Sequence, residues 1–429
     1  MKGGRTKVSL RDRLFAGQGR KRYHAGTHRT RTPAETLALI EPHLRGLGIT
    51  RVANVTGLDR IGVPVYLAVR PNGRSLAVSQ GKGLDGPSAK VSAIMESLEA
   101  YHAEFHQCAC RVATRAQLVE SCRDGSGVVD PLRLPRSRVS SDLAHRSMVW
   151  TTGEDVATGR VMWVPLEMVD LDFTLPHVFD TSMLLRSSNG LASGNSLAEA
   201  VLHGLIEVIE RDATGLMNLQ SPEEWARARL DLASVTDPDA RRLLVQFEKA
   251  DIAVSVWDVT TDIGVPAFLA AVFDRTTDEL LKPWPPILGS GAHPDRGVAL
   301  CRALTEAAQT RLTAISGSRD DIGRRDLAFD QSAEVIKHHR SLADERGVRD
   351  FRRIRSCATE TIQGDLRAIL ARLAAHGLRE VVAIDLSTES LPVHVARVIV
   401  PGLEGFMPES SALGERARAL EARRQRRRP

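Results

Sequence analysis

Three segments of this sequence repeat one arrangement of polar residues that is suited to holding cations. In each segment a polar residue is followed four positions later by Glu and, three positions after that, by Glu or Gln. In a helix, residues spaced by three and four positions lie on one face, so each segment would present its polar atoms together. The three copies are Ser92, Glu96 and Glu99; His203, Glu207 and Glu210; and Arg302, Glu306 and Gln309.

The second copy shows the pattern most clearly. At about 100° per residue, the polar residues of this helix fall within about 80° of arc. They are Glu199, His203, Glu207 and Glu210, and the opposite side holds Val201, Leu202, Leu205, Ile206, Val208 and Ile209. Like charges four positions apart repel by a few tenths of a kcal/mol per pair, so a cation is expected to compensate. Mg²⁺ takes hard oxygen ligands and usually joins protein carboxylates to phosphates. Two or three such helices facing one cleft would therefore make a Mg²⁺–nucleotide site.

The alternative interpretation is an acidic helix face that only meets solvent. A single Glu pair would favour that alternative, but three copies, each next to a Gly-rich or Ser/Asn-rich stretch, favour a binding site. The repetition also suggests an internal duplication of the fold. No Walker A pattern occurs, so nothing supports a P-loop domain.

The secondary-structure pattern around these copies is mixed. Strands and helices are expected without a regular βαβα alternation, so the fold class is α/β (α+β mixed). Thr32-Pro33 and Gly48 are start and stop signals for a helix from Thr32 to Leu47. Further helices are expected at 88–106, 196–219 and 294–316, strands at 50–57, 62–69, 75–79, 147–152, 161–164, 252–259, 266–274, 380–386 and 394–400, and a loop at 182–195.

Composition fits one large catalytic domain, predicted at 32–408. Of 429 residues, 42% are hydrophobic, and the net charge of +5 gathers at a basic, flexible arm (1–31) and an Arg-rich tail (409–429). Five sparse cysteines do not resemble a disulfide framework. Neither a signal peptide nor a membrane span is apparent, so a cytoplasmic location is expected. Aromatic residues make up 4%, which is poor for base stacking and makes a nucleic-acid partner a weak alternative.

At the three copies the sequence resembles the YcaO family. GKGLDGPSAKVSAIMESLEAYHAE (81–104), SSNGLASGNSLAEAVLHGLIEVIERDA (187–213) and GSGAHPDRGVALCRALTEAAQTRLTAISGSRDD (289–321) look like its three ATP-site motifs. DLSTESLPVHVARVIVPGLE (385–404) resembles its C-terminal strands, so the likeness covers roughly 32–404. GTHRTRTPAET (26–36) and RVANVTGLDRIGVPV (51–65) look like the branch whose members work beside a TfuA-type partner.

The resemblance implies an ATP- and Mg²⁺-dependent enzyme that phosphorylates a backbone amide oxygen of a ribosomally made peptide or protein. A nucleophile then adds and phosphate leaves. With sulfide the product is a thioamide, and a TfuA-like partner would help to deliver the sulfur. With a Cys, Ser or Thr side chain it is an azoline, as in the cyclodehydratases. A homodimer is also expected from the family alone.

By position in the motifs, the resemblance also implies site residues. Mg²⁺ would be held by Glu96, Glu99, Glu207 and Glu210, and the nucleotide by Ser92, Ser196, Glu199, Arg211, Gln309 and Arg311. Glu207, Glu210 and Arg211 would also act in catalysis. His203 lies on the carboxylate face and could transfer a proton or pair with a neighbouring Glu.

Two positions depart from the pattern. Ala100 stands where the family often has Arg, which removes one phosphate contact. Arg311 lies about 140° from Glu306 on the helical wheel, on the apolar side. Arg302 faces the site better and is the alternative to Arg311.

Other residues allow two interpretations each. Lys82, between two glycines, could meet a phosphate or the peptide, or be a solvated loop lysine. Asp212 could support the metal site, although a pair with Arg211 is favoured. A zinc site would need His102, His106, Cys108, Cys110 and Cys122, but their spacing matches no standard ligand pair and incidental residues at a helix end are favoured.

The predicted activity is ATP-dependent thioamide synthesis, with an azoline-forming cyclodehydratase or a non-catalytic peptide-binding scaffold as alternatives. Cyclodehydratases often end in alternating prolines, whereas this chain ends in arginines and Pro429. No Cys lies on the polar faces of the three copies, so external sulfide is expected to suffice. The tail lacks apolar periodicity after Leu420 and is expected to be dispensable for ATP hydrolysis beyond about residue 410.

Overall fold

The computed structural model describes residues 8–17, 19–106, 108–122, 124–138, 143, 145–175, 183–275, 286–322, 346–405 and 411–426. They divide into two compact units, each described by itself. Unit 1 comprises residues 1–21, 102–212 and 359–429, and unit 2 comprises residues 22–101 and 213–358. Among the described residues, no helix combines the length and apolarity needed to cross a membrane.

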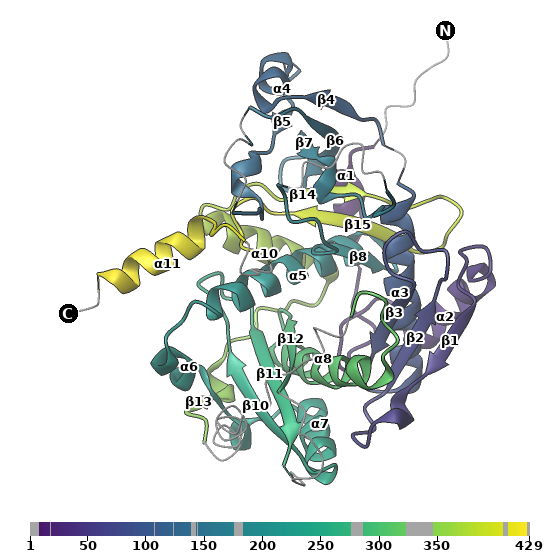
Figure 1. The fold of residues 1–429 in the computed structure, drawn as a ribbon, viewed down its shortest axis with the longest axis vertical. Helices are drawn as coiled ribbons and strands as arrows, with labels where there is room; N and C mark the ends of the chain where they lie inside the picture. Colours follow the sequence, from purple (N-terminus) through teal and green to yellow (C-terminus); the bar gives the residue numbers. More distant parts are fainter. Residues whose placement is uncertain are drawn as a thin grey trace. The chain divides into compact units, whose positions relative to one another are not determined.

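Unit 2 contains the same αβββα succession twice (Figure 1). In each copy a proline-initiated helix precedes a three-stranded antiparallel sheet, and a long helix follows the third strand. The first copy is α2 (Pro33–Ile40), β1 (Arg51–Asn54), β2 (Val65–Val69), β3 (Val78–Lys82) and α3 (Gly86–Glu104). The second is α7 (Pro238–Lys249), β10 (Ile252–Asp258), β11 (Ala267–Asp274), β12 (Ile287–Ala292) and α8 (Arg296–Ser316). The internal duplication suggested by the sequence motifs is therefore visible in the elements of this unit.

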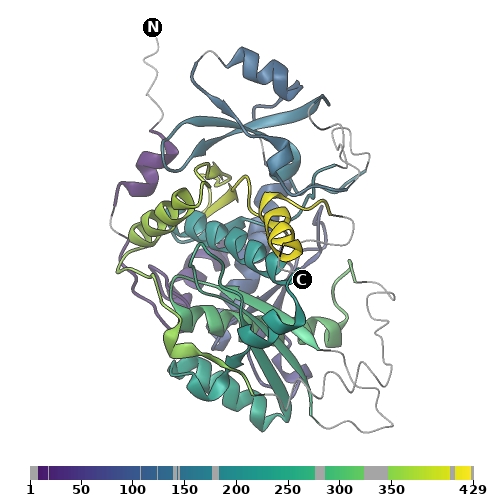
Figure 2. The same ribbon diagram turned by 90° about the vertical axis from the view of Figure 1, so that its left-hand side faces the viewer.

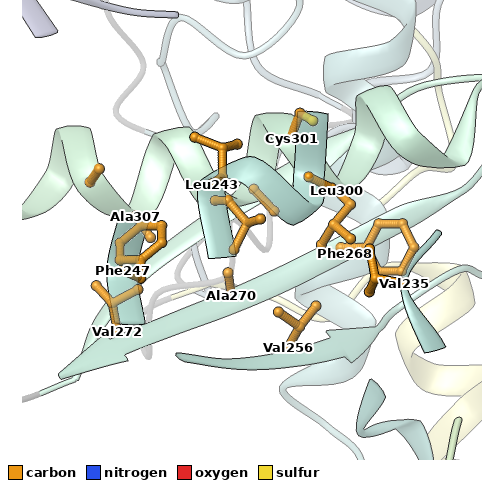
Figure 3. Close-up of a cluster of buried hydrophobic side chains, with 14 of the residues drawn as sticks. Val235, Leu243, Phe247, Val256, Phe268, Ala270, Val272, Leu300, Cys301 and Ala307 are labelled. Carbon is orange, nitrogen blue, oxygen red and sulfur yellow. The ribbon is translucent and has the colours of Figure 1, made fainter. Parts of the chain in front are cut away.

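A hydrophobic core lies between α7, α8 and the β10–β12 sheet. Figure 3 shows Leu243 and Phe247 of α7, Leu300 of α8 and Phe268 of β11 gathered between the helices and the strands. Each of these four side chains is 1% exposed or less. Burying such side chains contributes about 1.5–3 kcal/mol each, which fixes α8 against its sheet.

Unit 1 is built on a sheet of seven strands in the order β5-β7-β6-β14-β15-β8, with β4 also paired to β6. The strands are β4 (Arg111–Ala113), β5 (Gly127–Val128), β6 (Met148–Asp155), β7 (Val161–Pro165), β8 (Leu191–Gly194), β14 (Val382–Asp385) and β15 (His394–Ile399). The pairings are antiparallel except that of β5 with β7. The helices α1 (Leu10–Phe15), α4 (Arg115–Ser121), α10 (Ile362–Ala375) and α11 (Glu415–Gln425), with most of α5 (Leu197–Met217), complete the unit.

The three long helices predicted from the sequence are confirmed to within two residues at each end. The prediction for 32–47 is wrong in length, because α2 ends at Ile40. Pro42 cannot donate a helical hydrogen bond and its ring would meet the Ala38 carbonyl, so the chain continues as a 3₁₀ turn. The predicted loop at 182–195 contains strand β8, which pairs with β15.

The described part of the N-terminal arm is more ordered than the sequence predicted. In the N-terminal arm, Leu10 and Leu14 of α1 are buried, and Lys21 Nζ lies 2.6 Å from Asp365 Oδ2. At the other end, α11 begins beside α5 (Figure 2) and buries Ala417 completely. The tail therefore contributes a buried residue to unit 1, and its dispensability for ATP hydrolysis stays a prediction.

The anchor of α11 is a buried ion pair with α5. Arg416 Nε lies 3.0 and 3.1 Å from the two carboxylate oxygens of Asp212, which also accepts the Glu404 N–H at 3.0 Å. Glu404 in turn accepts the N–H groups of Gly414 and Ala417, each at 2.9 Å. Burial, opposed by Arg416, raises the pKa of Asp212 to about 6. Asp212 thus pairs with Arg416 and not with Arg211, and the favoured sequence interpretation is corrected.

We predict that Arg416→Ala lowers the free energy of unfolding by about 3 kcal/mol at pH 8, because it leaves the buried Asp212 carboxylate without its counter-ion. The folded pKa of Asp212, about 6, is above its unfolded value, so stability falls as pH rises from about 4 to about 6 and is constant above that range. Protonated Asp212 needs no counter-ion, so the loss should be smaller at pH 5. Denaturant unfolding at both pH values measures this difference.

The matched control for this variant is Arg423→Ala, an exposed arginine of the same helix. It should change stability by no more than about 0.5 kcal/mol. Equal losses in the two variants, or a loss that does not depend on pH, would contradict the role assigned to the Arg416–Asp212 pair.

Candidate functional site

Each of the three motif helices packs closely against a glycine of the strand that precedes it. A Cβ atom at Gly81 would lie 2.0 Å from the Ala93 nitrogen, and one at Gly291 would lie 2.4 Å from the Ala303 nitrogen. In both cases the contacted residue follows the glycine by twelve positions. Distances under 3 Å exclude any side chain there, so both strands need glycine for the same packing.

In unit 1, α5 packs against a glycine in the same way. A Cβ at Gly194 would lie 2.6 Å from the Ala200 nitrogen, and a Cβ at Gly83 of unit 2 would lie 2.7 Å from the Ala89 nitrogen. In both the contacted residue is six positions later. The strand-to-helix connection is therefore repeated in α5 as well as in α3 and α8.

The three helices also begin alike. A polar side chain caps each N-terminus by accepting the backbone N–H three residues later, as expected for an N-cap. The pairs are Asp85 with Ser88 at 2.8 Å, Ser196 with Glu199 at 3.2 Å, and Asp295 with Val298 at 3.1 Å. Ser196, predicted to contact a nucleotide, thus has its hydroxyl at the start of α5. The motif glutamate follows the capping residue by eleven positions in every case, so each lies at the same place on its helix.

In unit 2, Lys82 brings the polar residues of the third copy together. Its Nζ lies 2.6 Å from Glu306 Oε2 and 3.0 Å from Gln309 Oε1. Glu306 Oε1 accepts the Ser290 N–H at 3.1 Å. Lys82 is the last residue of β3 and not a solvated loop lysine. Its ammonium group therefore lies between Glu306 and the predicted nucleotide contact Gln309, where it offsets the negative charge of Glu306.

Glu96 of the first copy shares this electrostatic environment. Although its side chain reaches solvent, burial among the surrounding atoms raises the pKa of its carboxyl group, and the positive charge of Lys82 opposes that rise. Glu306 raises the pKa of Glu96 further. Ser92 and Glu99 are half-buried on the same helix. A cation placed here would relieve the repulsion between Glu96 and Glu306.

In unit 1, the second copy lies on α5 and is buried to different degrees. The Glu210 side chain is 2% exposed and that of Glu207 is 20% exposed. Arg211 Nη1 lies 3.7 Å from Glu210, and its Nη2 lies 4.0 Å from Glu207. His203 is half-buried on the same helix. The side opposite these carboxylates is packed as the sequence predicted, with Val201, Leu202, Leu205, Ile206, Val208 and Ile209 all buried.

Glu199 is hydrogen-bonded to a residue close to it in the sequence. Its Oε2 accepts the backbone N–H of Asn195 at 2.9 Å and the side-chain amide of Asn195 at 3.1 Å. Its exposed fraction is 1%. These bonds orient Glu199 at the first turn of α5, next to the cap formed by Ser196.

Arg397, a charged residue of β15 that is 0% exposed, was not among the residues predicted from the sequence. Its Nη2 donates to the Ser187 carbonyl at 2.6 Å, while its buried Nε and Nη1 atoms have no partner among the described residues. Burial lowers the pKa of Arg397 to about 10, although the negative charge of Glu207 acts in the opposite direction. Unpaired donors on a buried guanidinium are costly, so this group is suited to an anionic or carbonyl ligand. The only sequence signal was one arginine in a strand whose other residues, apart from His394, are apolar.

Arg311, predicted to contact the nucleotide, is paired with two aspartates. Its Nε is 3.0 Å from Asp59 Oδ2, and Nη1 and Nη2 are 3.1 and 3.2 Å from the oxygens of Asp274. All three side chains are at most 12% exposed. The guanidinium is thus used within unit 2, on the apolar side that the helical wheel indicated.

Comparison with known proteins identifies the chain's relatives. The family profile described as YcaO cyclodehydratase, ATP- and Mg²⁺-binding, matches residues 80–404. A Rhizobium leguminosarum bv. trifolii protein, described as an uncharacterized protein in the tfuA 3′ region, is 41% identical over 379 residues. That alignment covers 87% of this chain and 88% of the relative.

Solved structures show the same fold. YcaO from Methanopyrus kandleri bound with AMPPCP and Mg²⁺ is similar with a TM-score of 0.70 and 24% identity, over 91% of this chain and 99% of that one. A heterocyclase in complex with substrate and cofactor has the same TM-score and identity, over 91% of this chain and 54% of its own. The likeness confirms the mixed α/β fold class.

We predict that Arg397→Met leaves the thermal midpoint unchanged or raises it, because replacing an incompletely bonded buried charge by an apolar side chain is often neutral or stabilising. At the same time the variant should bind Mg·ATP at least about tenfold more weakly, which corresponds to about 1.4 kcal/mol. Thermal unfolding and calorimetry measure the two effects. Arg379→Met, at an exposed position of unit 1, is the control and should change neither. A large fall in the midpoint with normal binding would make Arg397 structural.

Proposed function

Since the chain belongs to the YcaO family, an ATP- and Mg²⁺-dependent family of enzymes, we propose that it activates a peptide-backbone amide by phosphorylation so that sulfide replaces the amide oxygen. The observation that carries the proposal is the threefold strand–cap–helix arrangement, which puts a glutamate at the same place on α3, α5 and α8. The relationship to a protein in a tfuA 3′ region supports sulfide as the nucleophile.

The residues present fit a Mg²⁺–nucleotide ligand. Glu96, Glu99, Glu207 and Glu210 supply the hard oxygen atoms that Mg²⁺ prefers. The pKa of Glu96 is raised, and the Lys82 ammonium lies beside Glu306. Both observations support a group of carboxylates that lie close together before a cation binds. When bound, Mg²⁺ would neutralise phosphate charge in the reaction. We assign these four glutamates to the metal.

The cationic residues of unit 1 are assigned to the phosphates and the reacting amide. Arg211 lies beside both α5 glutamates, and Arg397 has buried donors without partners. Donors held in advance where negative charge develops are worth more than donors that must reorganise. We include Ser92, Ser196, Glu199 and Gln309 as nucleotide contacts and leave Arg311 out, because its donors are already bonded to carboxylates. His203, half-buried between Glu199 and Glu207 on the same helix, is a candidate for proton transfer.

The proposed overall reaction consumes one peptide amide, one ATP and one hydrosulfide and gives a thioamide, ADP and phosphate. The amide oxygen takes the phosphoryl group, sulfur adds to the amide carbon, and the oxygen leaves with the phosphate. A ribosomally made peptide or protein is the proposed substrate, with a TfuA-like protein as partner in sulfur delivery. Azoline formation by a Cys, Ser or Thr side chain is the second candidate, because the same phosphorylated amide serves both.

We predict that Glu207→Gln and Glu210→Gln abolish Mg·ATP binding without loss of stability. Each change removes one negative charge from a crowded face, and the contacts to Arg211 at 3.7–4.0 Å are too long to contribute much. The thermal midpoint without ligand should stay the same or rise slightly. Calorimetric titration with ATP in Mg²⁺ measures the binding.

The control for these variants is Glu248→Gln, an exposed glutamate of α7, which should bind Mg·ATP normally. ATP affinity that is unchanged in Glu207→Gln and Glu210→Gln would refute the metal assignment. A large fall in the midpoint of the unliganded variants would show that the two carboxylates act in folding instead.

The reaction itself is tested by mass spectrometry of the product peptide. With ATP, Mg²⁺, sulfide and its own peptide, the enzyme should give a product heavier by the difference between sulfur and oxygen, together with ADP and phosphate. Loss of one water from a Cys-, Ser- or Thr-containing peptide, independent of sulfide, would establish a cyclodehydratase instead. Unchanged peptide despite a supplied TfuA-type partner would contradict the proposed reaction with that substrate.

A further inference from the structure

Two cysteines that the proposed site does not use lie together in unit 1. Cys108 and Cys110 lie between α3 and β4, and their sulfur atoms are 3.0 Å apart. Cys110 is exposed and Cys108 is half-buried. The described residues contain no group of three or more His, Cys, Asp or Glu side chains arranged to bind a metal ion, so the pair is not part of such a cluster. The two thiols are close enough to react with one another.

The surroundings make the two thiols unequal. Burial acts to raise the pKa of Cys108, but donors from His106, Cys110 and Thr151 and the charge of His106 outweigh it and lower the pKa to about 7. Burial, the neighbouring Cys108 and the charge of Asp170 raise the pKa of Cys110 to about 12. Near neutral pH a substantial fraction of Cys108 is therefore thiolate, while Cys110 stays protonated.

This combination is typical of a reactive thiol whose oxidised form is then attacked by a second, resolving thiol. A thiol whose pKa is close to the ambient pH is the best compromise between thiolate fraction and nucleophilicity. Reactive cysteines are accessible, have lowered pKa values and often lie next to a second, resolving cysteine. A disulfide across one intervening residue closes a small, strained ring, and strained disulfides are easily reduced.

Cys301 provides a contrast within the same chain. It is 2% exposed, its Sγ contacts Asp237 Oδ1 at 3.8 Å, and burial together with that carboxylate raises its pKa. Its environment therefore suppresses the thiolate, whereas that of Cys108 favours it. The difference comes from the groups around each sulfur, which are donors at Cys108 and an acceptor at Cys301.

We propose that Cys108 and Cys110 form a sulfur-transfer dithiol that takes the outer sulfur of a small-molecule persulfide and releases it as hydrosulfide. The proposal rests on the proposed function, for which hydrosulfide is the nucleophile. It lets the enzyme release hydrosulfide on its own chain from an external persulfide.

The chemistry balances in two steps. The Cys108 thiolate attacks the outer sulfur of the donor R–S–SH, so that Cys108 becomes a persulfide anion and the donor leaves as R–SH. The Cys110 sulfur then attacks the inner sulfur of that persulfide. Cys108 and Cys110 are oxidised to a disulfide, and the outer sulfur leaves as HS⁻ with the proton from Cys110. A dithiol reductant restores the starting pair.

The test uses the reduced full-length protein with one equivalent of glutathione persulfide, without ATP or peptide. Sulfide release is measured, and intact mass is recorded after the remaining thiols are alkylated. The wild type should release sulfide and lose two alkylatable thiols. Cys110→Ser should keep one extra sulfur on Cys108 and release sulfide at least about tenfold more slowly. Cys108→Ser should do neither, and Cys122→Ser, the control in the same unit, should behave as the wild type.

Sulfide release by Cys108→Ser at the wild-type rate, or the extra sulfur on a cysteine other than Cys108 in Cys110→Ser, would overturn the proposal. The assay contains no ATP, so it does not depend on thioamide formation. In a second assay with ATP and peptide, free sulfide should restore product in Cys108→Ser, whereas glutathione persulfide should not. If the wild type forms no thioamide even from free sulfide, the proposed function fails while the first assay still decides the role of the dithiol.

Discussion

The arrangement of the candidate site depends on one steric constraint, which is the contact of a glycine-bearing strand with the helix that follows it. Gly81, Gly194 and Gly291 each leave less than 3 Å between a would-be Cβ and the backbone of the next helix. Only a residue without a side chain allows the two backbones to pack so closely. Because each helix is also capped at the same point, its motif glutamate is fixed in position relative to the strand. Packing therefore positions the carboxylates before any ligand is present.

Such crowding of carboxylates has an electrostatic cost, and each unit offsets it with its own cations. In unit 2, Lys82 lies against Glu306 and lowers the pKa of Glu96 against the effect of burial. In unit 1, Arg211 lies near both glutamates of α5, and Glu207 favours the charged form of buried Arg397. These cations give the site both signs of charge, which a metal and a polyanionic nucleotide together require.

The surroundings of each group also decide the pKa values of Asp212, Cys108 and Cys301. Asp212 keeps a raised pKa because it is buried, yet it is held by Arg416 of α11, and this links the C-terminal helix to the carboxylate helix. Cys108 is made acidic by donors, whereas Cys301 is made less acidic by burial and Asp237. The two cysteines thus differ in acidity because their neighbours differ, and Asp212 serves as an anchor because of its own neighbours.

The sequence by itself determined the three motif helices, their polar faces and the duplicated pattern, because spacing along a helix and glycine or capping signals are local properties. It placed Arg311 on the apolar side for the same reason. Only the tertiary structure decided that Arg311 pairs with Asp59 and Asp274, that Asp212 pairs with Arg416, and that Arg397 is fully buried. It also ordered the N-terminal arm through Leu14 and Lys21. These partners are distant in the chain, and burial and charge pairing depend on which segments meet in space, which local periodicity does not encode.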